Sequence, residues 1–154
     1  MVLSAILYYE EAIYEACEIL KPEHFYDGRH RLIYKRAIDL MLEGAPVNNL
    51  AVVEKLKACG EFEKAGGYSY LAEIKAVTGT PSQIPHFGGI VQDKYLRREA
   101  INLSGEIATD CRDKGDMRAG DIVNGFVGRL LDISQIKEAA HYAVSYTHLT
   151  LPTN

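Results

Sequence analysis

The sequence predicts an all-α protein in which a compact helical body, residues 1–80, is followed by a long antiparallel helical hairpin, residues 81–143. Three observations predict this fold class. Apolar residues recur at steps of three and four along most of the chain, which is the spacing of one face of an α-helix. Clusters of glycine, proline and asparagine divide the first part into short helices, whereas two long helical patterns follow Pro85. No segment shows convincing β alternation.

Five short helices are expected in the body. Pro22 ends the second, because a residue before proline avoids the helical region. Gly44 ends the third, Asn48 or Asn49 caps the fourth, and a Gly66-Gly67 turn precedes the fifth. The expected ranges are Val2–Tyr9, Glu11–Leu20, Arg29–Glu43, Leu50–Ala58 and Tyr68–Val77.

Two long amphipathic helices, expected over Phe87–Arg112 and Ala119–Ala140, are joined by a short polar turn and therefore predict an antiparallel hairpin. A two-helix hairpin cannot bury both of its apolar stripes by itself, so one stripe needs the body or another chain. The alternative to a partner is a hairpin that folds flat on its own body. The residues expected to divide between the hairpin seam and a partner are Leu96, Leu103, Ile107, Phe126, Leu130 and Ile133.

The composition argues against several classes of protein. The net charge is -4, without the basic excess by which a duplex-binding domain neutralises phosphates. Local basic clusters at Arg29–Arg36 and Lys94–Arg98 remain open as contacts for phosphate or an acidic partner, with solvated helix faces as the alternative. No apolar stretch approaches the roughly 20 residues that span a bilayer, so no membrane partner is expected.

The cysteines and histidines do not predict a reactive or metal-binding site. Cys17, Cys59 and Cys111 are far apart in the sequence, which favours buried free thiols in a reducing compartment and a cytoplasmic location. His24 and His30 lie near Asp27 and could bind a metal in principle, but a capping or packing role for His30 is the preferred interpretation.

Motifs for catalysis are not found. The chain has no Gly-x4-Gly-Lys-Ser/Thr phosphate loop, no Gly-x-Gly-x-x-Gly turn, no Gly-x-Ser-x-Gly elbow and no His-Glu-x-x-His pair. We therefore expect no catalytic, cofactor-binding or metal-binding residue in this fragment.

The last residues, Val144–Asn154, differ from the charge-rich sequence before them because they contain no charged side chain and have no helical period. They resemble the translation of a transposon-end sequencing adapter, in a reading frame that fits from within the codon of Ala143. The expectation is a non-native tail over residues 144–154 and a gene that continues past Ala143, with a genuine disordered tail as the alternative.

Several short motifs, taken in order, resemble the N-terminal domain of the bacterial replicative DNA helicase (DnaB-like) family from near Val2 to roughly Ala140. No single motif would be sufficient, but their shared order and spacing are specific. They are Val2-Leu-Ser-Ala-Ile-Leu7, Glu18-Ile-Leu-Lys-Pro-Glu-His-Phe-Tyr26, His30-Arg-Leu-Ile-Tyr34, Gly44-Ala-Pro-Val47, Glu54-Lys-Leu56, Gly66-Gly-Tyr-Ser-Tyr-Leu71 and Thr80-Pro-Ser82.

The resemblance implies a six-helix body and a hairpin that pairs with other copies in the collar of a hexameric ring. It implies docking of primase and of a helicase loader. It also implies a separate RecA-like ATPase domain, absent here, that uses ATP and Mg and makes most of the DNA contacts. An enzyme name would therefore describe the parent protein and not this fragment.

Three features depart from the family pattern. Residues that complete the first helix ahead of Val2 are missing, and Pro85 leaves the start of the first hairpin helix open. The hairpin is also rich in glycine, although each interior glycine costs up to about 1 kcal/mol relative to alanine. These glycines are Gly88, Gly89, Gly105, Gly120, Gly125 and Gly128. Tight helix packing would be one reason to tolerate them, and a divergent phage-type helicase is another possibility.

Four residues of the matching motifs, Phe25, Tyr26, His30 and Tyr34, are expected to hold the loop before the third helix on the core by packing. Gly66 and Gly67 are expected to form a structural turn. The leading hypothesis for function is a helicase collar domain that assembles subunits and receives primase. The alternative is a free-standing helical regulator that binds nucleic acid through Arg29–Arg36. It predicts that these side chains converge with Lys94, Arg97 and Arg98 on one surface and do not pair with Asp or Glu.

Overall fold

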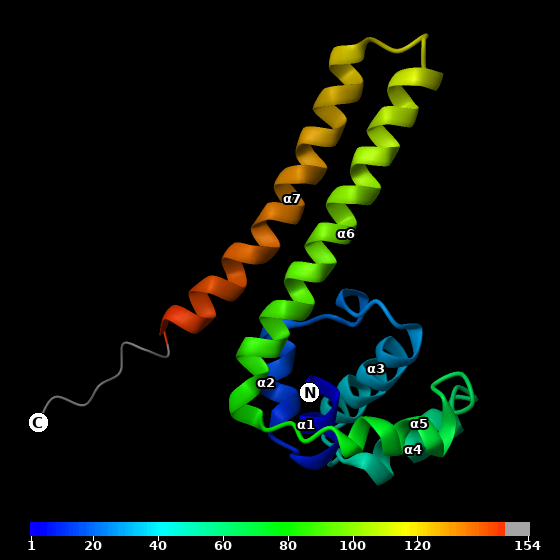
Figure 1. Cartoon of the computed structure of the whole chain (residues 1–154), viewed down its shortest axis with the longest axis vertical. Coiled ribbons are helices and arrows are strands. Elements are labelled where there is room, and N and C mark those ends of the chain that lie inside the picture. The colour runs from blue at the N-terminus through cyan, green and yellow to red at the C-terminus, as the bar shows by residue number, and fades with distance from the viewer. Residues whose placement is uncertain (147–154) are drawn as a thin grey trace, which may run out of the picture. The chain divides into compact units, whose positions relative to one another are not determined.

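The structure is a computed structural model that describes the backbone of residues 1–146 and the side chains of residues 1–134. Within that part of the chain, every regular element is a helix, which confirms the all-α prediction. The chain divides into two compact units, which are Met1–Gln92 and the residues from Asp93 onward. We call the first unit the body and the second the hairpin unit (Figure 1).

The body contains five α-helices that lie within two residues of the expected ranges. Asn48, and not Asn49, caps α4, because its side chain accepts the N–H of Ala51 at 3.0 Å. Asp27 caps α3 by accepting the N–H of Arg29 at 2.8 Å. The helices are α1 (Val2–Tyr8), α2 (Ala12–Ile19), α3 (Gly28–Leu42), α4 (Asn49–Ala58) and α5 (Gly67–Ala76), with 3-10 turns at Pro22–His24 and Pro81–Gln83.

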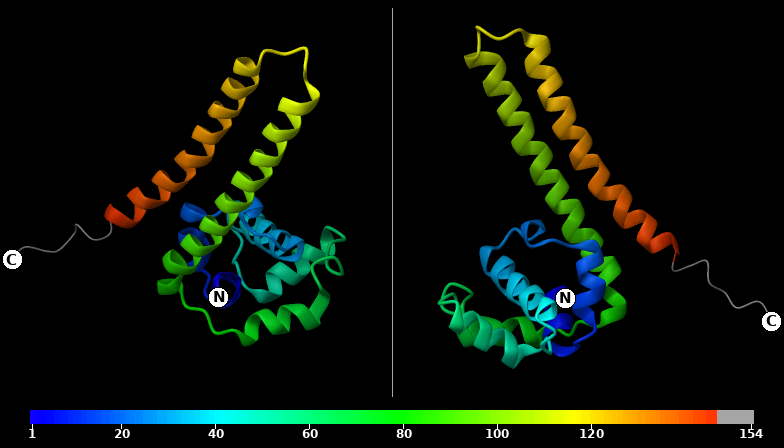
Figure 2. Two further views of the ribbon diagram at one scale, coloured as in Figure 1. Left: turned by 45° about the horizontal axis from the view of Figure 1, so that its top comes forward. Right: turned by 180° about the vertical axis from the view of Figure 1, so that it is seen from behind.

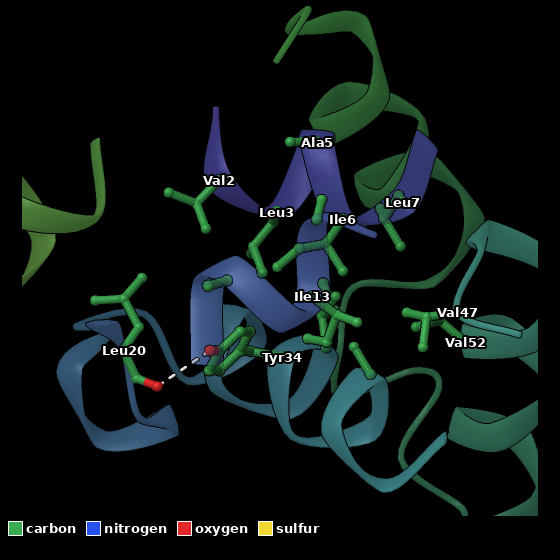
Figure 3. Close-up of a cluster of buried hydrophobic side chains, with 14 of the residues drawn as sticks. Val2, Leu3, Ala5, Ile6, Leu7, Ile13, Leu20, Tyr34, Val47 and Val52 are labelled. Carbon is green, nitrogen blue, oxygen red and sulfur yellow. Dashed lines mark hydrogen bonds between the residues drawn. The ribbon is translucent and has the colours of Figure 1, made fainter. Parts of the chain in front are cut away.

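Helix α1 lies inside the body, and its residues 2–7 are all buried (Figure 3). Tyr34 of α3 is fully buried beneath it, and its hydroxyl donates to the carbonyl of Leu20 at 3.1 Å. The hydroxyl of Ser4 donates to the carbonyl of Val77 and accepts the N–H of Gly79. A Cβ at Gly79 would collide with the backbone of α1, so only glycine allows this close approach.

Helix α6 (Ile84–Asp113) begins three residues before the expected start at Phe87. Pro85 therefore lies in the first turn and does not break the helix, because the N–H groups of a first turn have no intrahelical acceptor to lose. Ile84 is fully buried in the core of the body, and Gln92 donates to the carbonyl of Ile19 at 3.4 Å. The first residues of α6 thus belong to the body, and the division after Gln92 falls later than the boundary expected after residue 80.

The hairpin unit consists of the rest of α6 and of α7 (Ala119–Tyr146), which run antiparallel in both views of Figure 2. Leu103 of α6 packs with Ile122 and Phe126 of α7, and these three side chains are buried. Arg129 of α7 forms an ion pair with Glu106 of α6. The predicted hairpin is therefore present. Helix α7 continues through residues 144–146, and the remainder of the predicted tail, residues 147–154, lies outside the described residues.

In the described part of the chain, no helix combines the length and the apolar character of a membrane span.

Candidate functional site

One side of α7 carries a row of apolar side chains that are about half exposed. We define the outer row as Val123, Val127, Leu130 and Leu131, which are 44%, 45%, 49% and 57% exposed. Steps of four, three and one place these residues on one side of a helix. Scattered exposed apolar residues are ordinary, but a contiguous row on a long helix is typical of a surface that another chain covers.

The six residues predicted for the hairpin separate into two groups. Leu103 and Phe126 are buried, and Ile107 and Ile133 pack on them, so these four form the seam inside the chain. Leu130 lies in the outer row. Leu96 is half-buried in α6.

Three members of the outer row were not among the hairpin residues predicted from the sequence. Val123, Val127 and Leu131 follow the same helical spacing as the seam residues but are shifted around the helix by one position. That second stripe was visible in the sequence. The pattern could not show which stripe α6 covers.

Most of the hairpin glycines are not explained by close packing within this chain. A Cβ built at Gly105, Gly120, Gly125 or Gly128 would meet nothing within 4 Å. The expectation that tight packing explains the hairpin glycines is therefore wrong for these four within this chain. Their backbone is open to solvent or to another molecule. At Gly88 of α6, in contrast, a Cβ would lie 3.2 Å from Cγ2 of Ile19, which is close packing.

The arginines at the start of α3 are engaged in contacts within the body. Arg29 forms an ion pair with Asp27, and this hydrogen bond lowers the pKa of the Asp27 carboxyl to about 2. Arg36 binds both Glu61 and Asp39, and its hydrogen bond lowers the pKa of Glu61.

Arg31 is also held within the body. It donates to the backbone carbonyls of Phe25, at 2.6 Å, and Tyr26, at 3.2 Å. The alternative hypothesis required unpaired side chains between Arg29 and Arg36. Because Arg29 and Arg36 pair with carboxylates, that requirement is not met.

The aromatic residues around the loop before α3 differ in how deeply they are buried. Phe25 and Tyr34 are buried with their ring centroids 5.1 Å apart. His30 is half-buried, with its Nε2 atom 2.7 Å from the hydroxyl of Tyr70, and burial lowers its pKa. Tyr26 is 77% exposed, so the expectation that its ring packs on the core is wrong. Arg31 donates a hydrogen bond to its backbone carbonyl and so helps to fix the loop.

Gly66 and Gly67 form the turn before α5. Their φ angles are +95° and +63°, in the left-handed region that side chains rarely adopt. A Cβ on Gly66 would also lie 2.5 Å from the Cβ of Tyr70. This turn therefore requires glycine and sets the direction in which α5 and Tyr70 leave the loop.

The family model and the similar proteins all indicate the same protein family. A family model described as DnaB-like helicase N terminal domain matches residues 1–93. The replicative DNA helicase DnaB of Rhodothermus marinus is 40% identical over 97 residues, which are 63% of this chain and 10% of that protein. DnaB of Geobacillus stearothermophilus and DnaC of Bacillus subtilis (strain 168) are 28% and 29% identical over 141 residues, which are 92% of this chain and 31% of each relative. The chain thus spans less than a third of these relatives.

Two solved structures are similar. The N-terminal domain of DnaB helicase from Mycobacterium tuberculosis has a TM-score of 0.79 and 23% identity, covering 85% of this chain and 92% of that one, and shows the same fold. A structure described as a DnaB-like replicative helicase and its interactions with primase has a TM-score of 0.68 and 25% identity, covering 99% of this chain and 34% of that one.

Proposed function

Because the chain belongs to the DnaB-like helicase N-terminal domain family, we propose that it is the part of a replicative DNA helicase that joins subunits and receives primase. The outer row of α7 is the observation that carries this proposal. Four apolar side chains, each between 44% and 57% exposed, lie on one side of a long helix and would be removed from water by another chain.

The comparisons support the proposal at two points. The similar structure whose match covers 99% of this chain is described as that of a DnaB-like replicative helicase and its interactions with primase. The curated relatives are replicative helicases in which the aligned part is 10% to 31% of the length. In this proposal the chain contributes to the collar of a hexamer on which a helicase loader also acts. ATP and Mg are used by the remainder of the parent protein, which also makes most of the DNA contacts.

The proposal is tested first by the mass of the chain in solution. A variant that carries Val127→Glu and Leu130→Glu places two charges in the outer row, where burial in an interface would be costly. We expect the unaltered chain to associate with rising concentration in sedimentation equilibrium, and the double variant to remain a monomer with unchanged helix content.

Leu42→Glu is the matched control, because Leu42 is 75% exposed on α3 of the body and is not part of the hairpin unit. It should associate as the unaltered chain does. A double variant that also associates normally would contradict the assembly role.

Primase docking needs a separate measurement. A purified bacterial primase is titrated by isothermal calorimetry into the unaltered chain and both variants. We expect heat of binding with the unaltered chain and with Leu42→Glu. No binding to any of the three proteins would contradict the docking role, whatever their masses.

A further inference from the structure

A groove in the body lies apart from every residue used above for the proposed function. Its volume is about 510 Å³, and it runs along one face of α5, between α4 and the end of α1. Val53 and Leu71 are buried beneath it, and the exposed rings of Tyr8 and Tyr68 stand at it. A groove with an apolar floor and exposed tyrosines at its edge is typical of a protein-binding surface, because tyrosine buries a large area at low entropic cost.

Both tyrosines are held in place by lysines. The ammonium group of Lys57 donates to the hydroxyl of Tyr68 at 2.7 Å, and Phe62 meets the Tyr68 ring edge-on with a centroid distance of 4.8 Å. The ammonium group of Lys75 lies 4.9 Å from the centre of the Tyr8 ring. Rings that are already oriented lose little freedom when a ligand covers them, which favours binding.

The charge at the groove has one sign. Lys75 is the charged residue among the described side chains that line it, and no carboxylate lines it. Lys57, beside Tyr68, is already bound to Glu54 and to the Tyr68 hydroxyl. One available ammonium group suits a single carboxylate. A nucleic acid backbone needs several cations in a row, which this groove does not offer.

A second observation at the same groove points to a hydrogen-bond donor in the ligand. Asn49 lines the groove, and its side-chain oxygen is buried without a partner among the described residues. Buried acceptors are normally satisfied. An N–H of a bound peptide would supply the donor that this oxygen lacks.

We propose that this groove binds an acidic peptide segment of a partner protein. An aliphatic side chain of the peptide covers Val53 and Leu71, a carboxylate meets Lys75, and a backbone N–H reaches Asn49. The binding goes beyond the proposed function, because it uses no residue of the hairpin unit.

The test is a titration of the complete chain, labelled with ¹⁵N, with the blocked peptide acetyl-Leu-Asp-Leu-Asp-Gly-amide. We expect saturable shifts of the amide signals of Tyr8, Asn49, Tyr68 and Lys75. Two matched peptides, one with lysine in place of aspartate and one with alanine in place of leucine, should each bind at least about tenfold more weakly. Equal binding of the lysine peptide, or shifts confined to residues outside the groove, would overturn the proposal.

Variants locate the interaction. Lys75→Glu should weaken binding of the acidic peptide about tenfold or more, while Lys64→Glu, an exposed lysine that does not line the groove, should change it less than about twofold. Lys75→Gln is measured as well, because it removes the charge without introducing repulsion. Unchanged binding in both Lys75 variants would exclude the groove. An oligothymidylate that saturates the same signals more tightly than the peptide would show a nucleic acid site instead.

Discussion

At the scale of single residues, the body depends on buried polar groups that have partners. The hydroxyl of Tyr34 is the clearest example, because its ring is fully buried and its O–H donates to the Leu20 carbonyl and lies 3.6 Å from the sulfur of Cys17. Burial raises the pKa of this hydroxyl, so it remains a donor throughout the physiological range. Its partner carbonyl belongs to Leu20, the residue that ends α2 before the turn at Pro22–His24.

Tyr34→Phe tests that hydrogen bond. The variant keeps the ring but leaves the Leu20 carbonyl without its donor, so we expect a loss of about 1 to 2 kcal/mol in the free energy of unfolding. Urea denaturation measures it. Tyr26→Phe is the control, because Tyr26 is 77% exposed, and it should change stability by less than about 0.5 kcal/mol. Equal effects in the two variants would contradict the role given to Tyr34.

Asp27 gives a prediction for pH. Its pKa is lowered from 3.8 to about 2 by the hydrogen bond from Arg29. A carboxyl with a lowered pKa stabilises the folded state above its unfolded pKa, and that contribution is lost as the pH falls from about 4 to about 2. Asp27→Asn should therefore be less stable than the unaltered chain at pH 7 and lose less stability over that acid range.

Denaturation midpoints at pH 7, 4 and 2.5 measure this difference. Asp116→Asn, in the exposed turn between α6 and α7, serves as the control and should follow the unaltered chain. A parallel acid loss in Asp27→Asn and the unaltered chain would show that the ion pair with Arg29 contributes nothing.

At the scale of helices, glycine has two different roles in this chain. Gly125 lies inside α7, where a Cβ would meet nothing within 4 Å, so Gly125→Ala should stabilise the hairpin unit by about 0.5 to 1 kcal/mol. Gly66 has a φ of +95° beside Tyr70, so Gly66→Ala should destabilise the body by more than about 1 kcal/mol. Thermal unfolding monitored by circular dichroism measures both changes.

The sign of each change is what tests the structure. A destabilising Gly125→Ala would mean that α7 packs more closely than described. A stabilised Gly125→Ala that no longer associates would place this glycine at the surface between copies, where a methyl group would prevent close approach.

Helices and family were predictable from the sequence because they depend on local patterns. The α1–α5 ranges follow from spacing, caps and the Gly66-Gly67 turn, and the family resemblance is confirmed by the match over residues 1–93. The start of α6 was not predicted, because proline breaks a helix or begins it according to whether an N–H is needed there. The fate of the Arg29–Arg36 cluster depended on Glu61, which lies far along the chain, and no local pattern reveals such a pair.

The candidate surfaces were harder to predict for the same reason. Phe126 and Val127 are adjacent in a helical pattern, yet one is buried and the other is 45% exposed. Only the position of α6 decides between them. The groove beside Tyr8 and Tyr68 joins residues of three helices, so its existence depends on tertiary packing.

At the scale of the whole molecule, the two units differ in how much apolar surface they bury. The body has a continuous core that includes residues from all five of its helices and Ile84 of α6. In the described part of the hairpin unit, the buried cluster consists of Leu103, Ile122 and Phe126, with Ile107 and Ile133 against it. Local stability follows buried apolar contacts, so the hairpin unit should open more often than the body.

Phe126→Ala makes this difference measurable. Removing a buried phenylalanine typically costs about 3 to 5 kcal/mol, more than so small a cluster can lose and remain ordered. Hydrogen exchange should then show α7 amides near the unprotected rate while α3 amides keep their protection. Val127→Ala, at the neighbouring exposed position, should leave a dilute monomer unchanged. If Phe126→Ala instead lowered protection in α3 and α7 equally, the two units would unfold as one, and the difference in local stability inferred from their cores would be wrong.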